Sequence, residues 1–254
     1  MRVFLDRNVI SASVRIKESF MVREIEWGDQ KFNVQVAGWK GKPRRNGDHA
    51  WLYPEICNLP TLAKLAREGK VELCISNETH FESLSTGLEA NGTKGNIFAG
   101  VSISRMEDAL DRSCFQKGDI GILAARERVI EFCELLKACT WGVFEKIPEV
   151  EKYFPEFTLK NLQSLNRFHQ ILDQLPHRRH WPDAFQLWSA EVHSARYFVS
   201  LDRRFINKLK ESSQLELPCK PVFPSELLYG LGVTEIEPMP IEGTDFIDFT
   251  SMID

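Results

Sequence analysis

Near its start the chain reads Val3-Phe4-Leu5-Asp6-Arg7-Asn8-Val9-Ile10, in which three apolar residues run directly into an aspartate. A short, continuous apolar run is typical of a strand that is buried on both faces of a parallel sheet. Two later runs have the same character, Val71 to Ile75 and Tyr197 to Ser200. Helical patterns separate the three runs over crossover lengths. The sequence therefore predicts an α/β fold with a central, mainly parallel sheet and helices on both of its faces.

Helices are predicted where apolar residues recur at helical spacing next to capping residues or an initiating proline. We expect them at Leu62 to Glu68, from Ser104-Arg105-Met106-Glu107 onward, at Ile120 to Cys139, at Thr158 to Leu175, and from Pro182 to about Ser194. Alternating apolar residues between Ile25 and Val36, on either side of Gly28-Asp29-Gln30, predict a half-exposed β-hairpin.

The composition describes a folded chain with little net charge. Of the 254 residues, 43% are hydrophobic and 11% aromatic, which is enough for a core and excludes a disordered chain. Thirty-six Asp and Glu against 32 Lys and Arg give a net charge of −4. This charge argues against a protein that coats nucleic acid by bulk electrostatics, so any nucleic-acid contact has to be local. The length favours one enlarged domain.

The sequence also bears on compartment. No apolar run approaches the roughly 20 residues of a membrane helix, and no signal-peptide pattern precedes the first strand. The six cysteines are scattered without a C-x-x-C pair, which favours reduced thiols over zinc ligands or disulfides. We therefore expect a soluble, unprocessed, cytoplasmic chain with no membrane contact.

An acidic residue stands at or near the end of each predicted strand. Asp6 follows Leu5 directly, Glu82 lies one to two turns into the helix after the second strand, and Asp202 follows the third. Asp183 opens the helix that leads into the third strand. Because the carboxyl ends of parallel strands meet at one edge of a sheet, we expect the four side chains to converge there. Glu78, one helical turn before Glu82, is the alternative second acid.

Four convergent carboxylates need a counter-charge. Each close pair repels by roughly 3 kcal/mol at an effective dielectric constant near 20. Hard divalent cations offset this repulsion best, and a pocket of carboxylates without Cys or His favours Mg²⁺ or Mn²⁺. Such a site is typical of metal-activated water that attacks a phosphodiester.

The segments around these acids resemble the motifs of PIN-domain nucleases. Val3 to Ile10 is similar to the first motif, Ile75 to Glu82 to the second, Asp183 to Trp188 to the third and Tyr197 to Phe205 to the fourth. The 19-residue step from Asp183 to Asp202 is the one that the family's helix-strand unit requires. Arg7 departs from the family pattern, which has Thr or Ser there, and it either contacts phosphate or folds outward.

The resemblance implies a three-layer α/β/α PIN-like domain at residues 1–232, with insertions at about 16–58 and 91–175. It implies Mg²⁺- or Mn²⁺-dependent cleavage of RNA, single-stranded rather than duplex. Asp6, Glu82, Asp183 and Asp202 would act as metal ligands or water activators, and Asn8 would hold Asp6 in place.

Basic residues near these motifs are candidates for binding the RNA backbone. Besides Arg7 they are Arg178 and Arg179, where a helix N-terminus favours phosphate, Arg203 and Arg204 after the fourth acid, and the loop residues Lys40, Lys42, Arg44 and Arg45. Each group has an alternative interpretation as a solvated surface or an exposed linker. The spacing of His177 and His180 is compatible with zinc, but no second ligand pair accompanies them.

Two other functions are compatible with the same motifs. One is a catalytically silent RNA-binding or scaffold module. The other is a toxin or effector that is controlled by an inhibitory protein partner. Residues 233–254 form an acidic tail that contains Asp245, Phe246, Asp248 and Phe249; it either folds over the basic surface and competes with RNA or is disordered.

Overall fold

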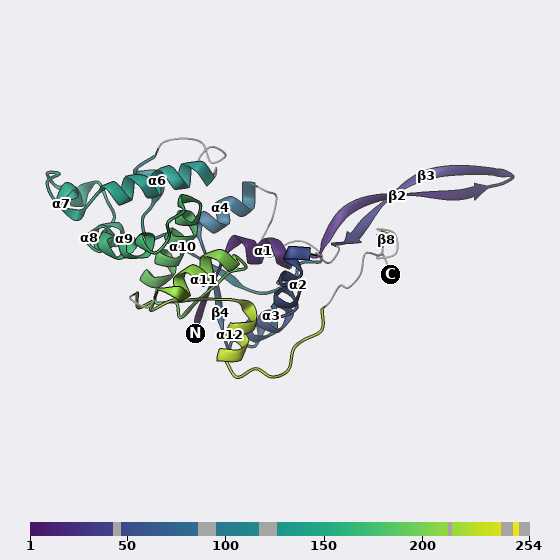
Figure 1. The fold of residues 1–254 in the computed structure, drawn as a ribbon. Coiled ribbons are helices and arrows are strands. Elements are labelled where there is room, and N and C mark those ends of the chain that lie inside the picture. Colours follow the sequence, from purple (N-terminus) through teal and green to yellow (C-terminus); the bar gives the residue numbers. More distant parts are fainter. Residues whose placement is uncertain (43–46, 86–94, 117–125, 213–214, 240–245, 249–254) are drawn as a thin grey trace.

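The protein is described by a computed structural model that covers residues 1–254 except 43–46, 86–94, 117–125, 213–214, 240–245 and 249–254. Its centre is a five-stranded, fully parallel sheet in the order β5-β4-β1-β6-β7. The strands are β1 (Arg2–Leu5), β4 (Glu72–Ser76), β5 (Ile103–Met106), β6 (Tyr197–Val199) and β7 (Lys220–Val222). With helices on both sides of the sheet, the predicted three-layer α/β fold is confirmed (Figure 1).

The strand order reverses at β1. Along the chain, β4 and β5 are added on one side of β1, whereas β6 and β7 are added on the other. Val3 pairs with Leu73 of β4 and with Tyr197 of β6, so β1 is the central strand. In open α/β sheets, ligands bind outside the carboxyl ends of the strands at such a reversal. This topology places residue 6 at the preferred position for a binding site.

Successive strand residues face opposite sides of the sheet and build two separate cores. Phe4, Cys74 and Phe198 pack on one side, and their neighbours Val3, Leu73 and Tyr197 pack on the other. The first core is covered by α6 (Arg126–Ala138), α8 (Glu156–Gln163), α9 (Leu165–Asp173), α10 (Trp181–Val192) and α11 (Arg203–Glu211). The second is covered by α1 (Arg7–Ser13), α2 (Leu52–Ile56), α3 (Leu59–Arg67) and α12 (Pro224–Gly230). Burial on both faces explains the continuous apolar runs in the sequence.

Two short helices complete the described set, α4 (Asn77–Ser85) after β4 and α7 (Trp141–Phe144) after α6. Among the helices that the structure describes, none combines the length and the apolar character needed to span a lipid bilayer.

The prediction of a helix that starts at Ser104 is wrong. Residues Ile103–Met106 form the edge strand β5, which pairs in parallel with β4 from Leu73 to Ser76. The capping-box spacing is a local signal, and here pairing with β4 determines the backbone conformation instead. The segment 91–175, expected to be an insertion, therefore contributes one strand to the central sheet.

The single helix predicted from Thr158 to Leu175 is two helices, α8 and α9. Ser164 interrupts them with φ −101° and ψ 21°, and its Oγ donates a hydrogen bond to the carbonyl of Lys160 at 2.9 Å. Serine side chains compete for backbone hydrogen bonds in this way and bend or end helices. The helices predicted at Leu62 to Glu68 and from Pro182 are confirmed as α3 and α10. Residues 120–125 of the remaining predicted helix lie outside the described part, which begins with α6 at Arg126.

The predicted hairpin is confirmed and is longer than expected. Strands β2 (Ile16–Trp27) and β3 (Gln30–Gly41) pair antiparallel up to Trp27 and Gln30, and Gly28 takes a φ of +64° in the tight turn. The hairpin projects away from the α/β body (Figure 1). Part of the expected acidic tail adds to its base, because β8 (Phe246–Asp248) pairs with β3 between Gly38 and Lys40.

We predict that the outer part of the hairpin does not support the folded body. Ser19 and Gly38 are paired, so residues 20–37 can be replaced by Asn-Gly without moving either end. Phe20 and Trp27 are 65% and 79% exposed, and no residue of this described stretch belongs to either core. The free energy of unfolding in urea should change by less than about 0.5 kcal/mol. A loss of several kcal/mol would mean that the hairpin is part of the folding unit.

Candidate functional site

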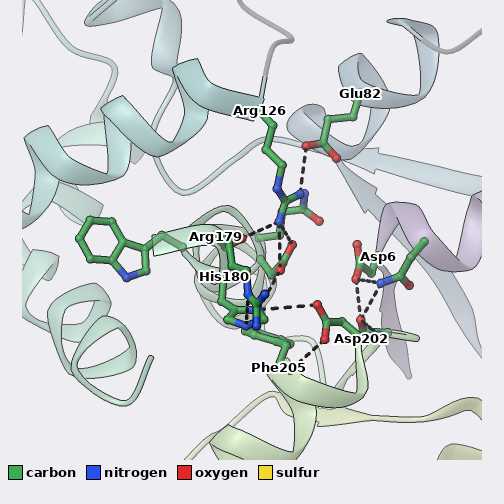
Figure 2. A network of polar contacts seen from close by, with 12 residues as sticks. Asp6, Glu82, Arg126, Arg179, His180, Asp202 and Phe205 are labelled. Carbon is green, nitrogen blue, oxygen red and sulfur yellow. Dashed lines mark hydrogen bonds and ion pairs between the residues drawn. The ribbon is translucent and has the colours of Figure 1, made fainter. Parts of the chain in front are cut away.

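The four predicted acids line one pocket of about 990 Å³ at the carboxyl edge of the sheet. Asp6 ends β1, Glu82 lies in α4, Asp183 lies in the first turn of α10, and Asp202 precedes α11. Asp6, Glu82 and Asp183 are only 3–5% exposed. Figure 2 shows Arg126 directed toward Glu82, and Asp202 directed toward His180 with Asp6 nearby. Segments almost 200 residues apart in the sequence thus bring their carboxylates together.

Hydrogen bonds hold Asp6 at the reversal of the sheet. Its Oδ2 accepts hydrogen bonds from Asn8 Nδ2 and from Ser200 Oγ, both at 2.5 Å. Asn8 also accepts the backbone N–H of Leu201 at 2.8 Å, so it links the ends of β1 and β6. Asn8 is therefore in direct contact with Asp6, where the family resemblance expects it. Ser200 was not singled out as a site residue from the sequence, although it is the last residue of the third predicted strand.

Asp202 has two structural contacts of different kinds. Its Oδ1 accepts the backbone N–H groups of Arg204 and Phe205 at 2.9 and 3.0 Å, so it is the N-cap of α11. Its Oδ2 faces the pocket and lies 3.6 Å from Nδ1 of His180. One carboxylate therefore fixes a helix start and also contributes an oxygen to the site.

Glu82 and its alternative Glu78 have different environments. Glu78 is buried against Arg112, whose Nε and Nη2 donate to its two carboxylate oxygens at 2.6 and 2.9 Å. The backbone N–H of Glu78 donates to Asp108. Glu78 does not belong to the pocket lining, whereas Glu82 does. The arrangement makes Glu78 part of a buried ion pair and Glu82 the acid of the site.

Arg126, the first residue of α6, stands between two of the acids. Its Nη2 lies 3.2 and 3.3 Å from the carboxylate oxygens of Asp183, and its Nη1 lies 3.9 Å from Glu82 Oε1. Nη2 also donates to the backbone carbonyl of Arg179 at 2.7 Å. Sequence reasoning missed this residue, because it lies 57 positions from Asp183 and carries no motif. Its charge partly neutralises the acid cluster.

Burial raises the pKa values of two of the acids, and a bound cation would lower them again. Burial, together with the nearby charge of Asp183, raises the pKa of Asp6 to about 8, although the hydrogen bond from Ser200 opposes this. Burial raises the pKa of Glu82 to about 6, although Arg126 and Arg7 lower it. Both ionised forms are costly in this pocket. A divalent cation would stabilise them, so the donor set fits such an ion.

The expectation of a pocket without histidine is wrong. His180 lies one helical turn before Asp183, and its Nδ1 is 3.8 Å from Asp183 Oδ2. The short turn Arg178–His180 directs this side chain under the start of α10, which the sequence pattern alone did not indicate. His180 itself is not part of the pocket lining, whereas the exposed His49 is.

A wall of basic and aromatic side chains stands beside the acids. Arg7, Lys42, Arg203 and Arg204, all predicted, line the pocket together with the unpredicted Arg15, Arg126, Trp51 and Tyr53. The guanidinium carbon of Arg203 lies 5.9 Å from the ring centroid of Trp51. Arg15, Lys42 and Trp51 come from the chain between α1 and α2, which also forms the hairpin, and Tyr53 lies in α2. Arg15, Trp51 and Tyr53 carry no sequence signal, because their place in the pocket depends on tertiary folding.

The remaining predicted basic residues lie elsewhere. Arg178 forms an ion pair with Glu134 and lies over the ring of Trp181, so it does not line the pocket. Arg179 is exposed and donates from Nε to His180 Nε2 at 3.2 Å. Lys40 is an exposed residue of β3. Arg44 and Arg45 lie outside the described residues.

Comparison with family models, with curated proteins and with solved structures gives no match to this chain. The interpretation of the pocket therefore depends on its own geometry.

We predict that the two glutamates of α4 contribute very differently to the free energy of unfolding. Glu78→Gln removes the carboxylate that two guanidinium nitrogens of the buried Arg112 contact, and it should lower the free energy of unfolding by about 3–5 kcal/mol. Glu82→Gln removes one of the crowded carboxylates and should change it by less than about 1 kcal/mol. Urea unfolding of both variants at pH 7.5, in chelator, measures the difference. Equal losses would contradict the assignment of Glu78 to a structural ion pair.

We also predict a specific pH dependence for Asp6. Its pKa of about 8 in the folded protein exceeds the usual value of 3.8, so between these values the folded state binds more protons than the unfolded state. The contribution of Asp6 to the free energy of unfolding therefore falls as the pH rises from about 4 to 8.

Asp6→Asn should abolish this loss of stability at higher pH, because asparagine does not ionise. Without metal, the variant should match the wild type near pH 4 and be more stable by at least about 1 kcal/mol at pH 9. Urea unfolding in chelator at several pH values tests this. A variant that is destabilised equally at every pH would contradict it.

Proposed function

We propose that this chain is a metal-dependent endoribonuclease of the PIN-like type that cleaves single-stranded RNA. The observation that carries the proposal is one pocket in which four acids lie beside six cationic side chains and two half-buried aromatic residues, Trp51 and Tyr53. The acids suit a divalent cation, and the cations suit the phosphate groups on either side of it. A phosphodiester is the substrate class that needs both.

The chain would hold the metal with Asp6, Asp183, Asp202 and Glu82, and Mg²⁺ or Mn²⁺ suits these oxygen donors. A divalent cation bound there supplies an activated water and stabilises the charge of the leaving oxygen. Asn8 and Ser200 keep Asp6 aimed into the pocket through their hydrogen bonds. Arg126 offsets repulsion between Asp183 and Glu82, and it can bind a phosphate oxygen when substrate enters.

The pocket wall favours a single strand. Unpaired bases can stack on Trp51 and Tyr53, and Arg203 beside Trp51 can bind the adjacent phosphate. With a net charge of −4 the chain has no bulk attraction for polyanions, so RNA binding depends on local cations such as those of the pocket. The six cysteines are all free thiols, which supports placing this activity in the reducing cytoplasm.

We predict metal-dependent cleavage that Asp183 controls. Purified protein with end-labelled single-stranded RNA should cut it in Mn²⁺, and chelator should stop the reaction. Asp183→Asn should reduce the rate by at least about 100-fold, because it removes a buried charge that holds the cation. The matched control is Asp173→Asn on the exposed side of α9, which should keep the wild-type rate.

The same assay separates the proposal from a second candidate, an RNA-binding module that does not cleave. The contact of Arg126 with Asp183 favours this candidate, since it partly neutralises the acids without metal. RNA binding without any metal-dependent product would establish it. A cut that persists in Asp183→Asn would contradict both readings of the pocket.

We further predict that the wall binds RNA in two physically different ways. Trp51→Ala should weaken binding of a single-stranded RNA by about 1–3 kcal/mol with little change in salt dependence, because it removes stacking. Arg203→Ala should lower the slope of log affinity against log salt concentration by about 1. Fluorescence anisotropy with catalytically inactive Asp183→Asn protein measures both. If neither variant alters affinity, the RNA does not lie along this wall.

A further inference from the structure

His180 presents a buried nitrogen atom to two acids of the pocket. Its side chain is 7% exposed, and its Nδ1 lies 3.6 Å from Asp202 Oδ2 and 3.8 Å from Asp183 Oδ2 (Figure 2). Among the described residues, this Nδ1 is one of the few buried side-chain atoms without a hydrogen-bond partner. Such atoms are rare in folded proteins, and each needs an explanation.

The distances around Nδ1 fit a shared ion better than direct hydrogen bonds. They are longer than hydrogen bonds between nitrogen and oxygen, which span about 2.7–3.2 Å. Two ligand atoms that each stand about 2.1 Å from one metal ion lie about 3–4 Å apart. Nitrogen and carboxylate ligand atoms of His180, Asp183 and Asp202 all lie within 4.8 Å of one another.

The surrounding contacts hold the three groups in place. Asp202 is fixed through the Oδ1 that caps α11, which leaves Oδ2 facing His180. His180 and Asp183 are separated by one turn at the start of α10, so the helix sets their spacing. The ring of His180 is buried next to Phe205, which limits its movement. A site of this kind is built before any ion arrives.

We propose that His180 Nδ1 is a nitrogen ligand of the cation, with Asp183 and Asp202 as oxygen ligands. This inference rests on the proposed function in one respect: both require the acids of this pocket to bind a divalent cation. Imidazole nitrogen suits transition-metal ions, whereas Mg²⁺ prefers oxygen alone. The site therefore selects Mn²⁺ or a later first-row divalent ion over Mg²⁺.

Binding through Nδ1 has a consequence for Arg179. In the metal-free protein, His180 Nε2 accepts a hydrogen bond from Arg179 Nε, so the proton of the neutral ring is on Nδ1. Metal binding through Nδ1 requires that proton to be on Nε2, which then becomes a donor. The hydrogen bond from Arg179 Nε to Nε2 must therefore break. Arg179 is exposed, so its side chain can turn into solvent.

The test uses the full-length chain and metal alone, without RNA. Mn²⁺ and Mg²⁺ affinities are measured by calorimetry, and pulsed electron paramagnetic resonance of the Mn²⁺ complex detects a coordinated ¹⁴N nucleus. The variants are His180→Gln and, as a matched control three residues earlier, His177→Gln, whose histidine is exposed. Wild-type protein that carries ¹⁵N-histidine provides an arm that needs no substitution.

We expect wild type and His177→Gln to show a nitrogen signal and to bind Mn²⁺ at least about tenfold more tightly than Mg²⁺. His180→Gln should lose the signal and at least about tenfold in Mn²⁺ affinity, with a smaller effect on Mg²⁺. Labelling with ¹⁵N-histidine should replace the ¹⁴N pattern.

Bound Mn²⁺ without a nitrogen signal, or a signal that survives in His180→Gln, would overturn the assignment. The outcome is independent of the proposed activity. RNA cleavage with no nitrogen signal leaves the nuclease standing and removes His180 from the ligands. A nitrogen signal with no cleavage keeps His180 as a ligand and contradicts the nuclease proposal. No metal binding at all overturns both.

Discussion

The site depends on one constraint: four carboxylates at one edge of the sheet repel one another and lose their hydration, which costs free energy. Asp6, Glu82 and Asp183 are almost fully buried, and burial raises the pKa of Asp6 and of Glu82. Such a cluster is costly in a metal-free protein, and it persists only where other interactions compensate. Here Arg126 compensates part of the charge, and Asn8 and Ser200 satisfy the oxygen of Asp6. The remaining cost is what a divalent cation would relieve.

The fold brings these groups together through its topology. Because strand order reverses at β1, the chain segments that follow β4 and β6 diverge on either side of Asp6. Glu82 approaches from α4, and Asp202 approaches from the cap of α11. Part of the basic and aromatic wall comes from elsewhere in the chain: Lys42 and Trp51 precede α2, and Tyr53 lies in it. The wall is not confined to that segment, because Arg7 and Arg203 directly follow the acids Asp6 and Asp202.

How far the sequence predicts this arrangement depends on the range of each interaction. The apolar runs of β1, β4 and β6 could be recognised because strands buried on both faces are almost wholly apolar; in β4 the exposed Glu72 is an exception. The acids that follow these strands could be found on that basis. The edge strand β5 could not, because its Ser-Arg-Met-Glu pattern resembles a helix start until β4 pairs with it. Arg126 was missed, and His180 was considered only as a zinc pair with His177, because no local pattern records their contacts with Asp183 and Asp202.

The separation between Glu78 and Glu82 illustrates what one helical turn decides. Both residues lie on α4 and both are buried, yet one neutralises Arg112 and the other lines the pocket. Crystals soaked in Mn²⁺ and measured for anomalous scattering would test the central claim most directly. The account predicts a peak in the pocket within about 2.5 Å of oxygen atoms of Asp183 and Asp202. Carboxylates that face apart, or a pocket with no peak while Mn²⁺ binds elsewhere, would contradict it.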